Sequence, residues 1–312
     1  MGRRIVITGG TGQLGRLLQR GLEAAGYEVG IIGRHEPGER QWDGRTLGPW
    51  AALLDGADAV INLAGRSVNC RYTEENLRQM LDSRVASTRV VGEAIARAKT
   101  PPKVWLQMST ATIYAHTFGP AHSEQEGRMG GDEPDVPAYW KRSVDIARAW
   151  EAALEQAQTP STRKVALRTA MVMSPDEGGV FSVLAQLARF GMGGAHAGGR
   201  QFVSWIHGSD FVRAVLFLLE REDLDGAVNL SAPNPLPQRD FMRALRRAMR
   251  QPVGLPAARW MLEVGAFFLR TDTELLLKSR RVVPSRLLEA GFSFHHPTWP
   301  EAAADLVGGT AG

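Results

Sequence analysis

A glycine-rich turn near the start of the chain constrains its fold more than any other feature. An apolar run over residues 4–8 leads into Gly9, Gly12 and Gly15, and leucines then recur every four residues, as on one face of a helix. The first glycine would allow a tight turn, the second would let a pyrophosphate approach the backbone, and the third would let helix and strand pack closely. A purely structural glycine turn is the alternative. The strand, glycine and helix order predicts a dinucleotide-binding loop.

Composition sets the class of protein. The 312 residues, 44% of them hydrophobic, can bury a large core and are expected to form two lobes. The single cysteine, Cys70, excludes an internal disulfide and fits a reducing compartment, so the cytoplasm is expected. Few apolar residues follow Arg3 and Arg4 before the glycines, and no apolar run approaches the length of a membrane span, so neither a signal peptide nor a membrane partner is expected.

Strand-like and helix-like segments alternate over the first half of the chain. This alternation is typical of βαβ units and predicts an α/β fold, a Rossmann-type doubly wound parallel sheet with a smaller, interleaved C-terminal lobe. The expected strands are 4–8, 28–32, 59–63, 104–108 and 164–169, and the clearest helices are 74–98 and 140–156.

The alternation breaks after residue 169, where Gly/Pro-rich loops separate shorter elements. We therefore expect residues 1–172 to form the dinucleotide-binding domain. A helix at 211–219 and a strand at 227–230 would return to it, so that about 203–232 completes this domain. Residues 173–202 and 233–307 are expected to form the smaller lobe.

The end of the second expected strand bears on the choice of cofactor. An acidic residue there would bind the ribose hydroxyls of NAD, whereas an arginine can neutralise the 2′-phosphate of NADP. The chain has Arg34 at this place. The alternative is an ordinary surface arginine, but its position at the adenosine end favours NADP(H).

Further motifs carry a resemblance to a known family. The third expected strand ends in Asn62-Leu63-Ala64-Gly65 and the fourth in Ser109-Thr110-Ala111-Thr112-Ile113-Tyr114. With the glycine loop, these resemble the extended short-chain dehydrogenase/reductase superfamily. Segments 167–169, 201–207 and 284–292 look like its uncharacterised "epimerase family" branch, which carries a C-terminal domain of unknown function. The resemblance spans nearly the whole chain.

The resemblance implies roles for individual residues. Thr110 falls where the superfamily's catalytic hydroxyl polarises a substrate carbonyl, and Arg84 replaces an asparagine that usually lies between the third and fourth strands. The residues expected to bind the cofactor are Gly9, Thr11, Gly12, Gln13, Leu14, Gly15, Arg34, Asn62, Leu63, Ala64, Gly65 and Arg84.

The catalytic Tyr-x-x-x-Lys pair of that superfamily is missing. Four residues beyond the four tyrosines stand Ile31, Asn76, Phe118 and Ser143, and none is lysine. Tyr139 and Lys141 would lie about 200° apart on a helix and cannot replace the pair. Tyr114 remains as a candidate proton donor, or as a phenol that only fills the wall of the cleft.

Other kinds of site find less support. His207 is expected to be structural rather than an acid, and Asp210 to cap the following helix. The seven histidines, among them the adjacent His295 and His296, show no clustered ligand spacing, so no metal site is expected. No G-x-S-x-G motif indicates a serine hydrolase.

A stripe of arginines in 239–250 could grip phosphates, but the solvated face of an amphipathic helix is the favoured interpretation. The net charge of +4 does not indicate nucleic-acid binding.

Two hypotheses about function follow. The first is an NADP-dependent oxidoreductase or epimerase that acts on an unknown small substrate, with Thr110 and Tyr114 as catalytic residues. The second is a catalytically weak or inactive NADPH sensor, which the missing lysine favours. A monomer or homodimer fits either hypothesis.

Overall fold

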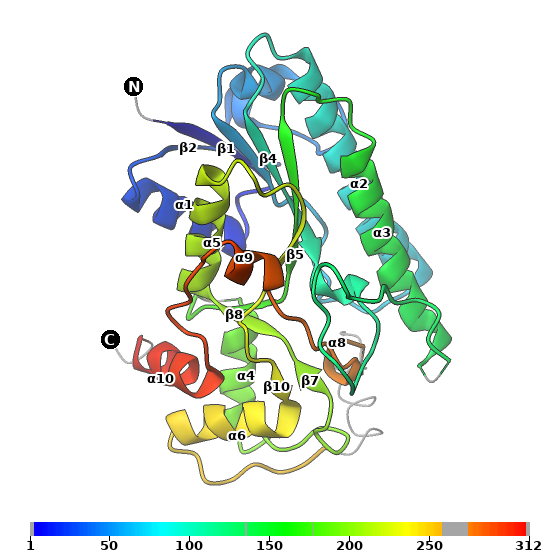
Figure 1. Ribbon diagram of the computed structural model, residues 1–312, viewed down its shortest axis with the longest axis vertical. Coiled ribbons are helices and arrows are strands. Elements are labelled where there is room, and N and C mark those ends of the chain that lie inside the picture. The colour runs from blue at the N-terminus through cyan, green and yellow to red at the C-terminus, as the bar shows by residue number, and fades with distance from the viewer. Residues whose placement is uncertain (1–2, 135, 177, 258–273, 310–312) are drawn as a thin grey trace.

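A six-stranded sheet forms the centre of the protein (Figure 1). The computed structural model describes residues 3–134, 136–176, 178–257 and 274–309. All neighbouring strands of the sheet are parallel, in the order β2-β1-β3-β4-β5-β9. These strands are β1 (Arg4–Thr8), β2 (Glu28–Ile32), β3 (Ala59–Asn62), β4 (Val104–Thr110), β5 (Arg163–Thr169) and β9 (Gly226–Leu230).

Helices cover both faces of this sheet, as a doubly wound fold requires. In Figure 1, α1 and α5 lie on one side of the strands, and α2 and α3 lie together on the other. Their bounds are α1 (Gln13–Ala24), α2 (Glu74–Arg97), α3 (Lys141–Glu155) and α5 (Gly208–Glu220). Short 3-10 turns are η1 (Gly38–Arg40), η2 (Pro49–Leu54), η3 (Ala111–Ile113) and η4 (Ala138–Trp140).

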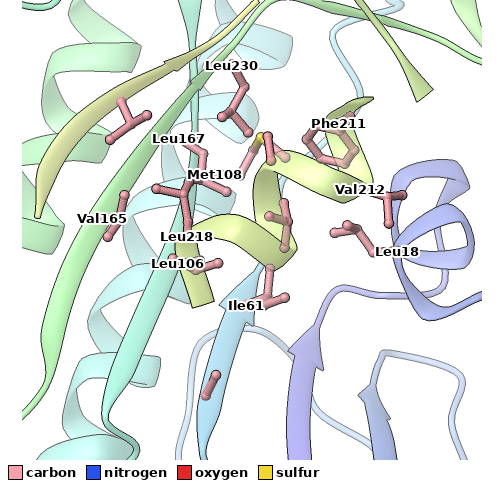
Figure 2. Close-up of a cluster of buried hydrophobic side chains, with 14 of the residues drawn as sticks. Leu18, Ile61, Leu106, Met108, Val165, Leu167, Phe211, Val212, Leu218 and Leu230 are labelled. Atoms are coloured by element: carbon pink, nitrogen blue, oxygen red, sulfur yellow. The ribbon is translucent and has the colours of Figure 1, made fainter. Parts of the chain in front are cut away.

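Alternation along the strands divides the core between the two faces. On β4, Leu106 and Met108 enter the cluster against α1 and α5, while Trp105 enters the cluster on the opposite face. Figure 2 shows the first cluster, in which Leu18 of α1 meets Phe211 and Val212 of α5 above the strands. Strands that are buried on both faces have nearly continuous apolar sequences, which is why their positions could be predicted from the sequence.

The outer edge of the sheet beside β2 departs from a full Rossmann order, in which a third strand would extend it. That strand is reduced to one parallel bridge between Gly33 and Gln41. Trp42, next in sequence, is buried and packs edge-on against Trp50. Aromatic packing thus replaces strand pairing at this edge.

A separate hydrophobic cluster lies below the sheet, around Trp205, Phe241 and Trp299. Two small sheets accompany it: β6 pairs with β8, and β7 pairs with β10. Figure 1 places α4, α6 and α10 around these strands. The bounds are β6 (Met171–Met173), α4 (Val180–Arg189), β7 (Phe202–Val203), β8 (Trp205–His207), β10 (Leu236–Pro237), α6 (Gln238–Ala248), α8 (Glu274–Leu277), α9 (Ser285–Glu289) and α10 (Trp299–Gly309).

The predicted fold class is confirmed. The late segment also behaves as expected, since β9 pairs with β5 and α5 packs on α1. The proposed domain boundaries stay a prediction. Among the described residues, no helix combines the length and the apolar character needed to cross a bilayer.

Candidate functional site

Each glycine of the predicted loop meets a different steric demand. Gly9 has φ +71°, and a Cβ there would lie 2.7 Å from the backbone of Ala64. A Cβ on Gly15 would lie 2.0 Å from the carbonyl oxygen of Gly10, so helix α1 could not pack against the turn. A Cβ on Gly12 would meet no atom within 4 Å among the described residues, apart from its chain neighbours. The first and third glycines hold the loop together, whereas the second leaves an open cradle.

The polar groups at the cradle suit an anion. Helix α1 begins directly after Gly12, with no side chain capping its N-terminus and no acidic residue in its first turn. Its first N–H groups therefore point into the cradle, where the helix dipole favours negative charge. The Nε2 of Gln13, the first residue of α1, is buried without a hydrogen-bond partner among the described residues and lies against Gly179. The residues present fit the pyrophosphate of a dinucleotide.

The end of the cradle beside β2 carries positive charge. Arg34 follows β2 and is exposed, and Thr11 packs its side chain near Gly33. Arg16 donates a hydrogen bond of 2.6 Å to the carbonyl oxygen of Thr11. The sequence analysis did not single out Arg16, although its place one turn into α1 could have suggested it.

Asn62 was expected to contact the cofactor, but its polar atoms are bound to other groups of the protein. Its side chain is fully buried, accepting hydrogen bonds from Thr8 (2.8 Å) and the Ala64 N–H (3.0 Å) and donating one to Gln107 (2.9 Å). These bonds join the ends of β1 and β3 to the middle of β4. Asn62 therefore shapes the floor of the site. Leu14 and Leu63 pack against the core, so they support the loop from below.

Arg84 brings a buried cation to the same edge of the sheet. Its side chain lies against Gly65, where a Cβ would come within 3.3 Å of it, and its guanidinium stacks on Trp150 at 4.9 Å. One guanidinium nitrogen donates to the carbonyl oxygen of Met80. Burial lowers the pKa of Arg84 to about 10, so it stays charged at neutral pH. A charge placed in this way favours an anionic or polar ligand beside Gly65.

Thr110 stands at the carboxyl end of β4 and is partly exposed. Its hydroxyl oxygen accepts a hydrogen bond of 3.1 Å from the N–H of Thr112, which begins the turn η3. The accepted bond fixes the oxygen and leaves the hydroxyl proton available for another acceptor. Thr110 can therefore donate to a carbonyl oxygen above the sheet.

Tyr114 does not reach this surface. Its side chain is only 1% exposed, and its hydroxyl donates to Asn229 and accepts from Arg168, both at 2.9 Å. Burial raises the pKa of the phenol. Arg168 in turn forms a buried ion pair with Glu151 at 2.8 Å. This geometry supports the structural interpretation of Tyr114 rather than the proton-donor expectation.

A buried lysine, which the sequence did not reveal, contacts the turn that follows Thr110. Lys278 Nζ donates a hydrogen bond of 2.9 Å to the carbonyl oxygen of Thr112, and Arg280 Nε donates one of 3.2 Å to its hydroxyl. Lys278 also lies 3.8 Å from Glu274, which accepts a hydrogen bond from Ser143. Burial lowers the pKa of Lys278 to about 8. Periodicity could not reveal this lysine, because it reaches the site from a distant segment.

Two further expectations concerned the N-cap of helix α5 and the position of Lys141. Helix α5 begins at Gly208, and its N-cap is His207 rather than Asp210, because the His207 ring accepts the N–H of Ser209. Lys141 pairs with Asp145 on its own helix.

Some arginines of the α6 stripe form ion pairs or hydrogen bonds with other groups of the protein. Arg243 pairs with Asp240, and Arg246 donates to the carbonyl oxygens of Gly193 and Pro252. The stripe is therefore not a uniform row of solvent-facing cations.

A polar hollow of about 1130 Å³ lies at the opposite end of the sheet, where the strands begin. Its lining includes Arg3, Asp58 and Lys103. Ligands of open α/β sheets bind outside the carboxyl ends of the strands, and the glycine cradle, Arg84 and Thr110 all lie there. We therefore assign the candidate site to the carboxyl end and not to the hollow.

Comparison with known proteins decides the family. A model described as the NAD dependent epimerase/dehydratase family matches residues 5–231. The chain belongs to this family. A second model, a domain of unknown function (DUF1731), matches residues 257–306. The predicted resemblance, including its C-terminal domain of unknown function, is thereby confirmed.

Relatives in this family match almost end to end. The human epimerase family protein SDR39U1 is 30% identical over 97% of this chain and 99% of its own length. The epimerase family protein Mb2239 of Mycobacterium bovis is 33% identical, with 96% and 95% coverage. The crystal structure of human SDR39U1 (isoform 2) with NADPH superposes with a TM-score of 0.85 at 28% identity, covering 98% of this chain and 99% of that one.

Proposed function

We propose that this protein binds NADP(H) at the carboxyl end of its sheet and acts as an NADP-dependent oxidoreductase or epimerase on a small substrate. The observation that carries the proposal is the cradle at Gly12, where open space meets the uncapped start of α1. Arg34 supports NADP over NAD because its guanidinium can neutralise a 2′-phosphate. The similar human protein was crystallised with NADPH, which agrees with this choice.

Each group at the site would have a separate task. The N–H groups at the start of α1 and Gln13 would hold the pyrophosphate, and Arg34 the 2′-phosphate. Arg84 would face the polar part of the cofactor next to Gly65. When bound, the nicotinamide supplies or accepts a hydride. Thr110 would donate a hydrogen bond to the substrate oxygen as its charge changes.

A sensor that binds NADPH without efficient turnover is the second candidate. Two observations favour it: no tyrosine has a lysine four residues on, and the Tyr114 phenol is buried away from the site. Both remove the usual proton shuttle of the short-chain dehydrogenases. This candidate predicts tight cofactor binding combined with negligible reduction of any carbonyl compound.

Cofactor titration tests the proposal directly. Quenching of tryptophan fluorescence by NADPH and NADH gives the two affinities, and Arg34→Ala should remove most of the preference for NADPH. The expected loss is about 1.5 to 3 kcal/mol, typical of hydrogen bonds to a charged group. Arg189→Ala, at another exposed arginine, is the matched control. Equal affinities for both cofactors in the unmodified protein would refute the assignment of Arg34.

A second measurement separates enzyme from sensor. NADPH-loaded protein is incubated with carbonyl-containing sugar nucleotides and simpler ketones, and oxidation of the cofactor is followed. Turnover that depends on Thr110 supports the enzyme. If no compound is turned over while NADPH still protects the protein from proteolysis, the sensor is the better description.

A further inference from the structure

Three side chains that could hold a metal ion meet far from one another in sequence. His207 ends β8, His296 lies in the loop before α10, and Asp305 is on α10. Each offers one ligand atom, and these atoms lie within 4.8 Å of one another. The sequence predicted no metal site because the spacing shows no motif. The fold creates the cluster by bringing the C-terminal segment against the start of α5.

The His207 ring is oriented for coordination. Its Nε2 is buried and has no hydrogen-bond partner among the described residues, although Asp305 Oδ2 lies only 3.2 Å away. The carboxylate therefore lies off the direction in which an N–H would point. A tetrahedral ion about 2.0 to 2.1 Å from both atoms would place them about 3.3 Å apart, with the oxygen about 35° away from the direction in which the ring nitrogen points.

The other ring nitrogen of His207 is held by the backbone turn that follows. Nδ1 lies 2.7 Å from the hydroxyl of Ser209 and 3.1 Å from its N–H. As the α5 cap, Nδ1 accepts the Ser209 N–H, which leaves the ring proton on Nε2. A metal ion on Nε2 would move this proton to Nδ1, which would then donate to the Ser209 hydroxyl in place of the cap bond.

Asp210 fixes the second histidine. Its carboxylate is fully buried and accepts hydrogen bonds from the N–H groups of His295 (2.9 Å) and His296 (2.8 Å). The two bonds hold this loop against the start of α5, and the His296 ring lies 3.9 Å from the His207 ring. Asp210 thus positions the backbone of His296, whereas Ser209 contacts the ring of His207.

We propose that His207, His296 and Asp305 bind a divalent transition-metal ion, with Zn²⁺ as the best match. Two imidazoles and one carboxylate suit zinc and its neighbours, whereas magnesium and calcium prefer oxygen ligands. Asp305 is exposed, so water can complete a fourth position. The ion would join the start of α5, which packs on the dinucleotide-binding helix α1, to the C-terminal α10.

Metal titration of the full chain, prepared without a histidine tag, tests the proposal. After treatment with a chelator and its removal, ZnCl₂ is titrated by calorimetry and CoCl₂ by visible absorption. The wild type should bind about one equivalent of each ion. His296→Ala and Asp305→Asn should each weaken Zn²⁺ binding at least about tenfold, since even the loss of supporting groups costs 10- to 100-fold.

The adjacent His295 provides the matched control, because it is not part of the cluster. His295→Ala should leave affinity and stoichiometry unchanged. His207→Ala is avoided, since this residue also caps α5. Thermal unfolding gives a second readout: Zn²⁺ should raise the melting temperature of the wild type and His295→Ala but not of the two ligand variants. A wild type that binds no ion, or variants that bind as tightly as the wild type, would overturn the proposal.

Discussion

The Ser143 hydroxyl donates a hydrogen bond of 2.6 Å to Glu274 Oε2. Ser143 lies four residues beyond Tyr139, where a Tyr-x-x-x-Lys helix would carry its lysine. Glu274 in turn lies 3.8 Å from the buried Lys278. The C-terminal segment thus supplies a carboxylate and an ammonium group next to the place that the missing lysine would occupy, and it also holds the turn after Thr110.

Gly12→Val should abolish dinucleotide binding while the protein stays folded. A Cβ at Gly12 would have open space among the described residues, so the valine side chain would enter the cradle and occupy the space that a pyrophosphate needs. NADPH titration measures the loss, and circular dichroism checks the fold. Gly308→Val, which also adds a side chain in open space, serves as the control. Retained micromolar binding by Gly12→Val would place the cofactor elsewhere.

Thr110→Val should lower turnover of any carbonyl substrate by about 10²- to 10³-fold, as is typical when one donor to a developing oxyanion is removed. NADPH affinity should hardly change, because Thr110 would donate to the substrate. Thr110→Ser restores the hydroxyl and should recover most of the activity. Steady-state kinetics with separate values of kcat and KM checks this, and full activity in the valine variant would remove Thr110 from the catalytic machinery.

Tyr114→Phe should destabilise the protein by about 1 to 3 kcal/mol with little effect on NADPH affinity. The change removes the hydroxyl that Arg168 and Asn229 share, and both groups remain buried. Urea unfolding measures the stability. A variant as stable as the wild type but with much slower turnover would restore the phenol as a proton donor.

Lys278→Met should change how stability depends on pH. The folded protein releases the Lys278 proton near pH 8, while the unfolded chain keeps it up to about pH 10.5. Between these values the unfolded state binds more protons, so the wild type gains stability as pH rises, by about 2 to 3 kcal/mol in total. The variant lacks this gain.

Urea unfolding at about pH 7 and about pH 10 gives the comparison for Lys278. Lys103→Met, at an exposed lysine, controls for the loss of a positive charge. Parallel pH dependence of the wild type and Lys278→Met would contradict a buried, perturbed amine.

Local patterns in the sequence were enough to predict the sheet and the glycine cradle. Strands such as β1 and β2 begin and end at the predicted residues, because buried parallel strands form apolar runs that turns interrupt. Gly12 was found in the same way, since its surroundings depend on neighbours within a few residues, whereas the role of Thr110 was implied by the resemblance to a known family. The strands and the cradle share a dependence on residues that are close together in the sequence.

The parts that escaped prediction depend on contacts between distant segments. Nothing near Asn62 in the sequence shows that Thr8 and Gln107 occupy its polar atoms. Lys278 reaches Thr112 across 166 positions. His207 and His296 are likewise separated by most of the C-terminal lobe. Such contacts arise only once the chain has folded, and periodicity within one element carries no record of them.

The position of β9 in the sheet has a consequence for the order in which the chain can assemble. Strand β5 pairs on one side with β4 and on the other with β9, which begins only at Gly226. A growing or truncated chain that ends earlier would leave β5 as an open, largely apolar edge, a template for pairing with other chains. Fragments that stop before residue 226 should therefore aggregate. The sheet that supports the glycine loop after β1 is complete only once β9 has paired with β5.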